Sequence, residues 1–154
     1  MKNKFVLSTF PKSRGRRLRG SSWVRNLTSE TKINITNLVQ PIFVKDSISI
    51  DREVIKMPGI KRFSLKDLGE EVENLLKLGI KAIAIFPVVK DSIKSSNAAE
   101  ALNPENLICR CLKFLRREFP ELGVICDIAL DPFTLSGHDG ILNKDGIIDN
   151  DSTI

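Results

Sequence analysis

Three short apolar runs alternate with segments of helical spacing, and this alternation limits the fold more than any other feature of the chain. The runs, at residues 37–44, 82–86 and 122–130, are rich in Val, Ile, Leu and Ala. Each run has the length of a strand, and each intervening segment is long enough for a helix that crosses over to a parallel neighbour. The sequence therefore predicts an α/β fold with right-handed crossovers.

The segments between the runs carry helix start and stop signals. Ser64 is followed three residues later by Asp67, which is a variant of the capping box. Gly79 has the position of a glycine that ends a helix in the left-handed conformation. A second helix is predicted to begin at an Asn103 cap and to end at Pro120.

Weaker local signals complete the expected arrangement. Pro41 either weakens the first strand or marks a bulge, because proline cannot donate to a strand ladder. Residues 143–146 are expected to form a hairpin turn. A short helix is predicted around residues 23–27, and another is expected to begin at a cap formed by Asp151 or Ser152.

The choice among α/β folds depends on the residues just after each strand. No Gly-rich phosphate-binding motif comes after any predicted strand, so a nucleotide-binding doubly wound sheet is disfavoured. A (β/α)₈ TIM barrel remains, but such barrels need about 250 residues and the chain has 154. We therefore expect residues 33–154 to form an incomplete N-terminal part of a barrel, with about three βα units.

The charge is concentrated at the N-terminus. Residues 1–32 hold nine Lys and Arg and one Glu, a net charge of +8, whereas the rest of the chain carries −3. We interpret residues 1–32 as a basic, extended N-terminal arm that either binds an anionic surface or packs on a partner subunit. Its composition also suits a mitochondrial presequence. The body carries no nucleic-acid-binding motif, so we do not expect nucleic acid as a partner.

Cysteine content and hydropathy indicate the compartment. The chain has three cysteines, an odd number, and no secretory signal, which favours reduced thiols and a cytoplasmic location. Cys109 and Cys111 lie in the second predicted helix, where buried cysteine is commoner than a metal ligand. No apolar run reaches the roughly 18 residues that span a bilayer, so no membrane association is expected.

The third predicted strand ends in acidic residues. Asp127 lies within it, Asp131 lies just after it, and even spacing puts both on one face with Ala129. Asp139 and His138 can return to the same place through a glycine-flanked loop, and barrels carry their catalytic groups at this end of the strands. The loop aspartates also fit an ordinary turn. Asp127 is different, because a carboxylate inside an apolar strand is costly to bury unless it is paired.

Several strings in the chain resemble one family. They are "RRLRGSSWVRNLTSET" (16–31), "MPGIKRFS" (57–64), "LGIKAIAIFPV" (78–88), "EALNPENL" (100–107), "FPELGVICDIALDPFT" (119–134) and "GHDGIL" (137–142). In this order they resemble the N-terminal half of delta-aminolevulinic acid dehydratase, also called porphobilinogen synthase, over nearly the whole chain.

The resemblance implies a function as well as a fold. The family is a lyase of haem and tetrapyrrole biosynthesis that condenses two molecules of 5-aminolevulinate into porphobilinogen. It forms homo-oligomers, commonly octamers, through N-terminal arms, and it binds its substrates through Schiff bases to two lysines.

The two Schiff-base lysines of the family lie in the second half of the barrel, and Lys45, Lys90 and Lys94 are predicted to be surface residues. We therefore expect the 154-residue chain to be a fragment or a truncated product that is inactive alone. The alternative is a non-catalytic chain that acts only in subunit interaction.

The resemblance also gives the aspartates a role. Zinc-dependent members carry cysteines at the positions of Ala129, Asp131 and Asp139, and an alanine with two carboxylates cannot reproduce that soft site. The chain therefore resembles the aspartate-rich subgroup, which lacks this zinc and is often stimulated by magnesium. Asp127, Asp131 and Asp139 are the expected contacts of the substrate amine, and Asp131 and Asp139 are the candidate metal ligands.

Overall fold

The computed structural model describes residue 9 and residues 11–12, 15–46 and 50–154. The chain divides into two compact units, with the boundary between Ile33 and Asn34. In the first unit, a 3₁₀ turn precedes helix α1 (Ser22–Thr28), which confirms the short helix predicted there. Residues 1–8, 10 and 13–14 of the predicted arm lie outside the described residues.

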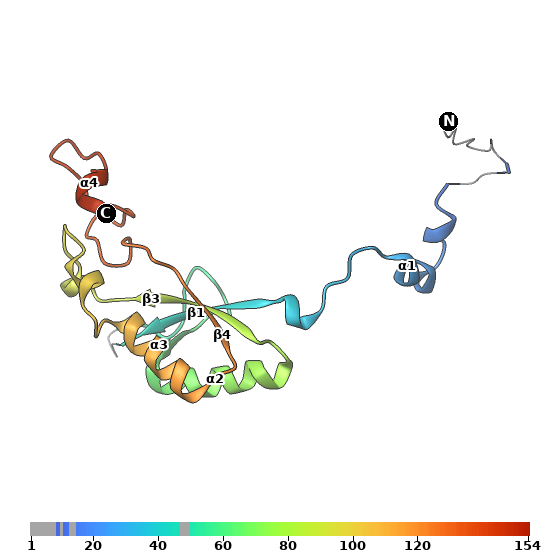
Figure 1. The fold of residues 1–154 in the computed structure, drawn as a ribbon, viewed down its shortest axis with the longest axis horizontal. Coiled ribbons are helices and arrows are strands. Elements are labelled where there is room, and N and C mark those ends of the chain that lie inside the picture. Colours follow the sequence, from blue (N-terminus) through green and yellow to red (C-terminus); the bar gives the residue numbers. More distant parts are fainter. Residues whose placement is uncertain (1–8, 10, 13–14, 47–49) are drawn as a thin grey trace, which may run out of the picture. The chain divides into compact units, whose positions relative to one another are not determined.

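The second unit is built on a sheet of four parallel strands (Figure 1). The three predicted strands are confirmed as β1 (Val39–Lys45), β3 (Ala82–Val88) and β4 (Gly123–Cys126). A further strand, β2 (Arg62–Ser64), pairs with the end of β1 and completes the order β2-β1-β3-β4. The sequence did not predict β2, because three residues are too few to show the alternation of a strand.

Pro41 lies within β1 without interrupting its pairing. The register between β1 and β3 is continuous and places Pro41 opposite Ala84, so the bulge considered from the sequence is absent. Strand β2 pairs only with residues 43–45, which leaves the other edge of β1 open beside Pro41. An open edge is where a residue without an N–H group can be tolerated in a sheet.

Strand β4 is shorter than predicted. The apolar run suggested a strand to Leu130, but β4 ends at Cys126, the last residue that pairs with β3. Asp127 therefore comes after the strand instead of lying within it. Among the described residues β4 pairs with β3 alone, so no second neighbour supports its continuation.

Helix α2 (Leu65–Leu78) begins and ends as its sequence predicts. The Ser64 hydroxyl oxygen accepts a hydrogen bond from the Asp67 backbone N–H at 3.2 Å and donates to the Asp67 carboxylate at 2.7 Å. The bond from Ser64 lowers the pKa of Asp67 below its ordinary value. Gly79 ends the helix with φ of 90°, a conformation that glycine adopts without strain.

Helix α3 (Leu107–Glu118) has a different cap from the one predicted. The Asn106 side chain accepts a bond from the Cys109 N–H at 2.9 Å, whereas Asn103 forms a turn by accepting from the Glu105 N–H at 3.0 Å. Asparagine is a favourable cap at either position, so local sequence could not distinguish the two. The prediction of Asn103 was wrong because the packing of the helix decides where it begins. The helix begins where its apolar face becomes buried, and Asn106 is itself only 5% exposed.

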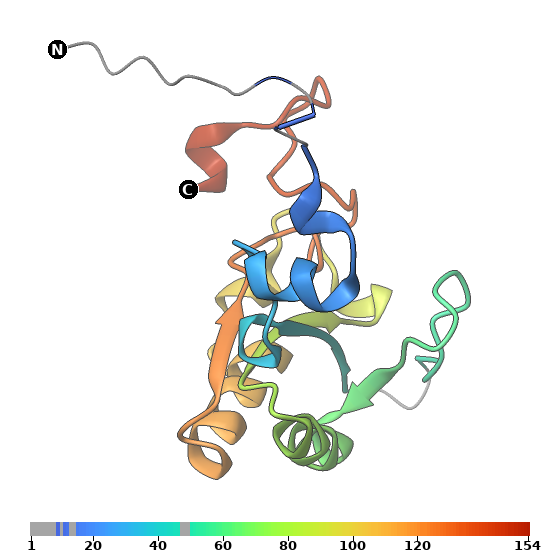
Figure 2. The same ribbon diagram turned by 90° about the vertical axis from the view of Figure 1, so that its right-hand side faces the viewer.

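Helices α2 and α3 cover one face of the sheet (Figure 2). The buried strand residues of that face are Ile42, Val44, Ile83 and Ile85. The helix residues that complete this core include Leu68, Val72, Leu75, Leu107, Cys111 and Leu115. On the opposite face, Phe43 and Phe86 are only half-buried, so the second unit has a core on one side of its sheet.

The C-terminal segment contains the predicted hairpin turn at residues 143–146, which links an isolated antiparallel bridge. The short helix α4 (Asn150–Thr153) comes next. Its cap is Asp149, whose carboxylate accepts from the N–H groups of Asp151 and Ser152, so the predicted caps were wrong by two or three residues. No helix in the described part of the chain is long and apolar enough to cross a bilayer.

The position of the α3 cap can be tested by paired substitutions. We expect Asn106→Ala to lower the free energy of unfolding by about 2 kcal/mol, because it removes a cap and leaves buried backbone groups without a partner. The exposed Asn103→Ala should cost about 0.5 kcal/mol or less. Urea denaturation followed by circular dichroism measures both, and a larger loss for Asn103→Ala would place the cap at Asn103.

Candidate active site

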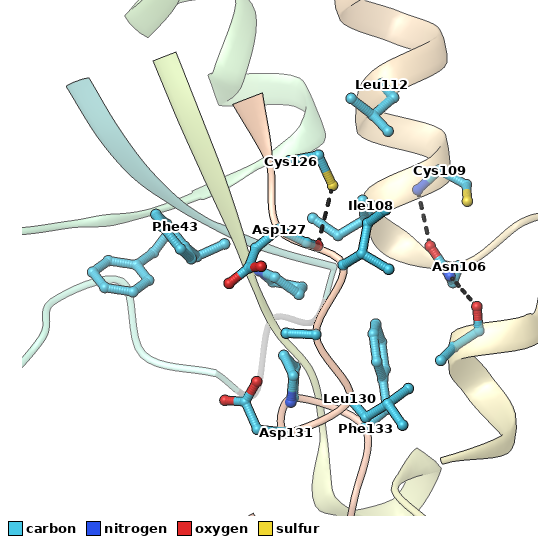
Figure 3. A pocket seen from close by; sticks show the side chains of 16 residues that line it. Phe43, Asn106, Ile108, Cys109, Leu112, Cys126, Asp127, Leu130, Asp131 and Phe133 are labelled. Carbon is cyan, nitrogen blue, oxygen red and sulfur yellow. Dashed lines mark hydrogen bonds between the residues drawn. The ribbon is translucent and has the colours of Figure 1, made fainter. Parts of the chain in front are cut away.

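A cavity of about 490 Å³ lies where β1, β3 and β4 reach their carboxyl ends (Figure 3). Its walls come from β1, β3, α3, the last residue of β4, Cys126, and the segment after it, residues 127–133. Asp127 and Asp131 both line it, together with Ala129. The structure thus brings two of the three predicted aspartates to one cavity, at the end of the strands where barrel enzymes place their catalytic groups.

Asp127 lies on the face of the sheet that the helices do not cover. Cys126 pairs with Ile85, and continuing the register by one residue places Asp127 beside Phe86. The ring of Phe86 lies 6.1 Å from the ring of Phe43, measured between centroids. Asp127 is exposed, so the burial that would have needed a charged partner does not occur in this structure. The reason is that β4 ends one residue earlier.

Asp131 extends the acidic surface along the same chain segment. The side chains of Asp127 and Asp131 point to the same side, whereas Cys126 points the other way, toward α3 (Figure 3). Asp131 is exposed, and the next residues turn back because the Leu130 carbonyl accepts bonds from the N–H groups of Phe133 and Thr134 at 2.8 and 3.0 Å. We call Asp127 and Asp131 the acidic pair.

Asp139 reaches the same segment but has a different contact. Its Oδ1 accepts a hydrogen bond from the Leu130 backbone N–H at 2.6 Å, and it does not line the cavity. His138 takes part through its backbone carbonyl, which accepts from the Thr134 hydroxyl at 2.9 Å. The loop does return toward the end of β4. Asp139 is bonded to Leu130, which is the residue directly before Asp131 of the acidic pair.

Two connecting residues were not predicted as part of the site. The Ser95 N–H donates to the Phe133 carbonyl at 3.0 Å, and the Ser95 carbonyl accepts from Leu135 at 3.2 Å. Thr134, which forms the parallel bridge with Ser95, is only 1% exposed. These bonds join the loop after β3 to the loop after β4. Nothing in the local sequence distinguishes Ser95 or Thr134 from ordinary loop residues.

Two of the three lysines near the strand ends have partners within the chain. Lys45 donates to the Ile50 carbonyl, and the Lys94 ammonium lies 2.8 Å from the Asp91 carboxylate. The bond from Lys94 lowers the pKa of Asp91. Lys90 is exposed as predicted, whereas Lys45 and Lys94 are half-buried, so their prediction as surface residues was only partly right.

The acidic residues do not assemble a metal site by themselves. In residues 9, 11–12, 15–46 and 50–154, no group of three or more His, Cys, Asp or Glu side chains is placed to hold a metal ion. The position of Ala129 offers no donor, and Asp131 and Asp139 offer oxygen, not sulfur. This donor set does not fit a tetrahedral zinc site.

Three cysteines, none in a disulfide, lie around α3 and β4. Cys111 is fully buried, and burial raises its pKa to about 12. Burial also raises the pKa of Cys126, which lines the cavity together with Cys109. Cys109 is half-buried, so the expected burial of the helical pair holds fully only for Cys111.

The chain is similar to known proteins of one family. A family model described as delta-aminolevulinic acid dehydratase matches residues 12–154. Relatives with that name from Bradyrhizobium diazoefficiens and Chlamydia pneumoniae are 40% and 37% identical over 92% and 90% of this chain, and the matches cover 40% and 42% of their own length. Further relatives, including that of Glycine max, are named as chloroplastic.

A solved structure gives the same result in three dimensions. Delta-aminolevulinic acid dehydratase from Toxoplasma gondii ME49, in complex with the reaction product porphobilinogen, matches with a TM-score of 0.84 and 38% identity. The match covers 92% of this chain and 40% of that one, so the chain spans less than half the length of these relatives. The four-stranded parallel unit with its helices is accordingly the N-terminal part of a (β/α)₈ barrel, preceded by an arm.

Thiol reactivity tests the burial of the cysteines beside this cavity. With a pKa of about 12, Cys111 should be thiolate in only about one molecule in ten thousand at pH 8, and its reactivity should keep rising to pH 12. We expect an aromatic disulfide reagent to label Cys109 first and Cys111 only on unfolding. Mass spectrometry of labelled peptides identifies the site, with Cys109→Ser as the control. Rapid labelling of Cys111 at pH 8 would contradict its burial.

Proposed function

The chain belongs to the delta-aminolevulinic acid dehydratase family, and we propose that it supplies the acidic wall of a site that makes porphobilinogen from 5-aminolevulinate. Two substrate molecules condense with loss of two molecules of water, which is a lyase reaction of haem and tetrapyrrole biosynthesis. The observation that carries the proposal is that Asp127 and Asp131 line one cavity at the strand ends. The family match over residues 12–154 supplies the reaction.

The proposed role of the aspartates is to hold the amino group of one substrate. An ammonium ion is attracted by two carboxylates that point to the same side, as those of the acidic pair do. A carboxylate beside the amine can also accept the proton that the amine must lose before its nitrogen enters the pyrrole ring. Asp139 is included in this proposal, since its contact with Leu130 uses Oδ1 and the second oxygen has no hydrogen-bond partner among the described residues.

We propose that the Schiff-base lysines of the site lie outside these 154 residues. A lysine that attacks a carbonyl must present a neutral amine at the reacting carbon. Lys94 is paired with Asp91, Lys45 is bonded to a backbone carbonyl, and Lys90 is exposed, so none has the surroundings that such a lysine needs. We therefore propose that this chain makes no porphobilinogen unless the rest of a barrel is present.

Magnesium, the oligomer and the compartment are parts of the same proposal. Stimulation by magnesium would need further ligands, because the described residues supply no group of three. Assembly into a homo-oligomer through residues 1–32 would cover the apolar side chains of α1, where Trp23 is 68% exposed. A cytoplasmic location is supported by three cysteines that form no disulfide.

A chimera tests the proposed reaction. The chain is joined to the part of the Bradyrhizobium diazoefficiens relative that it does not match, and porphobilinogen is measured by its colour reaction. We expect activity from the chimera and none from the 154-residue chain. Asp127→Asn and Asp131→Asn should each lower kcat/KM by about 10²- to 10⁴-fold, because each removes a carboxylate from the amine.

The matched control is Asp145→Asn, which removes an exposed aspartate from the hairpin turn. It should leave kcat/KM within about twofold, since surface changes away from the site have small effects. Turnover by the chain alone would overturn the proposal about the lysines. Unchanged kinetics in both substituted chimeras would overturn the role of the acidic pair.

A second candidate function is subunit interaction without catalysis. It is favoured by the large apolar side chains exposed on the first unit, since Leu18, Trp23 and Leu27 are 60%, 68% and 74% exposed. Where exposed apolar side chains form a contiguous patch, they often mark a surface that binds another protein. The partner would be an intact member of the same family.

Co-purification tests this second candidate. A tagged chain should retain an untagged full-length relative, and the paired change Trp23→Ser with Leu27→Ser should reduce retention at least about tenfold by removing the apolar contact. The same changes at the exposed Ile55 and Leu102, which lie in the second unit, serve as the control. Equal retention by both double variants, or no retention at all, would exclude the arm as the contact.

A further inference from the structure

The loop after β4 is closed at its neck by one side chain. The Asp139 Oδ1 lies 2.6 Å from the Leu130 backbone nitrogen, although nine residues separate the two in sequence. Within the loop, the Thr134 hydroxyl donates to the His138 carbonyl at 2.9 Å. The bond from Thr134 to His138 lies within the loop, whereas the bond between Asp139 and Leu130 joins the two ends of the loop.

The backbone that carries Asp127 has few other supports. Residues 127–129 form no regular structure, and beyond the pairing of β4 with β3 no further backbone–backbone hydrogen bond joins them to the described part of the chain. Strand β4 fixes the chain up to Cys126, and the next fixed peptide is that of Leu130. The segment between them is therefore held at its two ends, and the bond from Asp139 is part of the second end.

The residues that come directly after Asp131 and Pro132 in the loop are buried. Phe133 is 5% exposed and Thr134 is 1% exposed, and the Leu130 carbonyl accepts from both of their N–H groups. The backbone of Leu130 is thus held by its carbonyl through the buried turn and by its N–H through Asp139. Removing the carboxylate would free the N–H of Leu130, the residue that directly precedes Asp131.

We infer that Asp139 is a positioning residue, whose Oδ1 holds the Leu130 peptide and thereby sets the direction in which Asp127 and Asp131 enter the cavity. The importance of this for catalysis rests on the proposed function, but the contact itself does not. The bond joins two residues that are nine positions apart, so an acceptor at this place can keep the short loop closed. The role differs from direct contact with the substrate amine, because it needs an acceptor at Oδ1 and not a negative charge.

Hydrogen exchange of the Leu130 amide tests the inference in the 154-residue chain. Asp139→Ala should speed that exchange by at least about tenfold, because the N–H loses its acceptor. Asp139→Asn keeps an amide oxygen at this place, so its exchange should stay within about threefold of the unsubstituted chain. The control, Asp145→Ala, should leave the Leu130 amide unchanged.

Several results would overturn the inference. The Leu130 amide of the unsubstituted chain could exchange as fast as an unprotected amide, or Asp139→Ala could leave its exchange unchanged. Equal acceleration in Asp139→Ala and Asp139→Asn would also contradict it, since an acceptor alone would then not be enough. A chimera that makes no porphobilinogen while the exchange rates show the expected order would defeat only the proposed function.

The same Asp139 variants in the chimera test the inference by kcat. If positioning governs the acidic pair, Asp139→Asn should recover at least about tenfold of the kcat that Asp139→Ala loses, in parallel with the recovery of Leu130 protection. Equal kcat in the two variants, with protection restored only by asparagine, would show that the closed loop does not position the acidic pair for catalysis.

Discussion

A parallel sheet is stable when both of its faces are covered and its strands have neighbours, and the rest of this structure depends on how far that condition is met. Helices α2 and α3 cover one face, where Ile42, Val44, Ile83 and Ile85 are almost fully buried. The other face carries half-buried phenylalanines, and Ile125 of β4 remains 53% exposed. Parallel strands that are apolar on both faces belong to folds in which both faces are buried. The match covers only 40% of the solved relative's chain, and the remaining strands and helices of a barrel would supply that cover.

The incomplete cover bears on where the cavity lies. The cavity is lined by Phe43 and Phe86 on the uncovered face and by residues of α3, and the residues after β4, which has no second neighbour among the described residues, form another part of its wall. Asp127 and Asp131 are exposed there at no desolvation penalty, which removes the burial cost that a carboxylate inside a strand would carry. A full barrel would exclude more water from the same side chains and would thereby strengthen their attraction for a cation.

Loops from different βα units hold this wall in place. Ser95, after β3, is bonded to Phe133 and Leu135, after β4, and Asp139 is bonded to Leu130. Sequence reasoning expected Asp139 near the strand end and gave it a role toward the substrate or a metal. The contact with a backbone N–H adds a third role, which depends on geometry and cannot be read from residue type. The burial of Thr134 also could not be predicted from the sequence, because a threonine in a loop is usually exposed.

Local sequence by itself determined the α/β alternation, the cap at Ser64, the helix end at Gly79 and the turn at residues 143–146, because these depend on residues a few positions apart. The family and the acidic residues at the strand end could also be predicted from the sequence, because short strings of residues identify them. Tertiary structure alone decided the pairing of β2, the end of β4 at Cys126, and the choice of Asn106 over Asn103 as a cap. Each of these depends on a partner far away in the chain: a strand continues only while a neighbour pairs with it, and a helix begins where its apolar face meets the sheet.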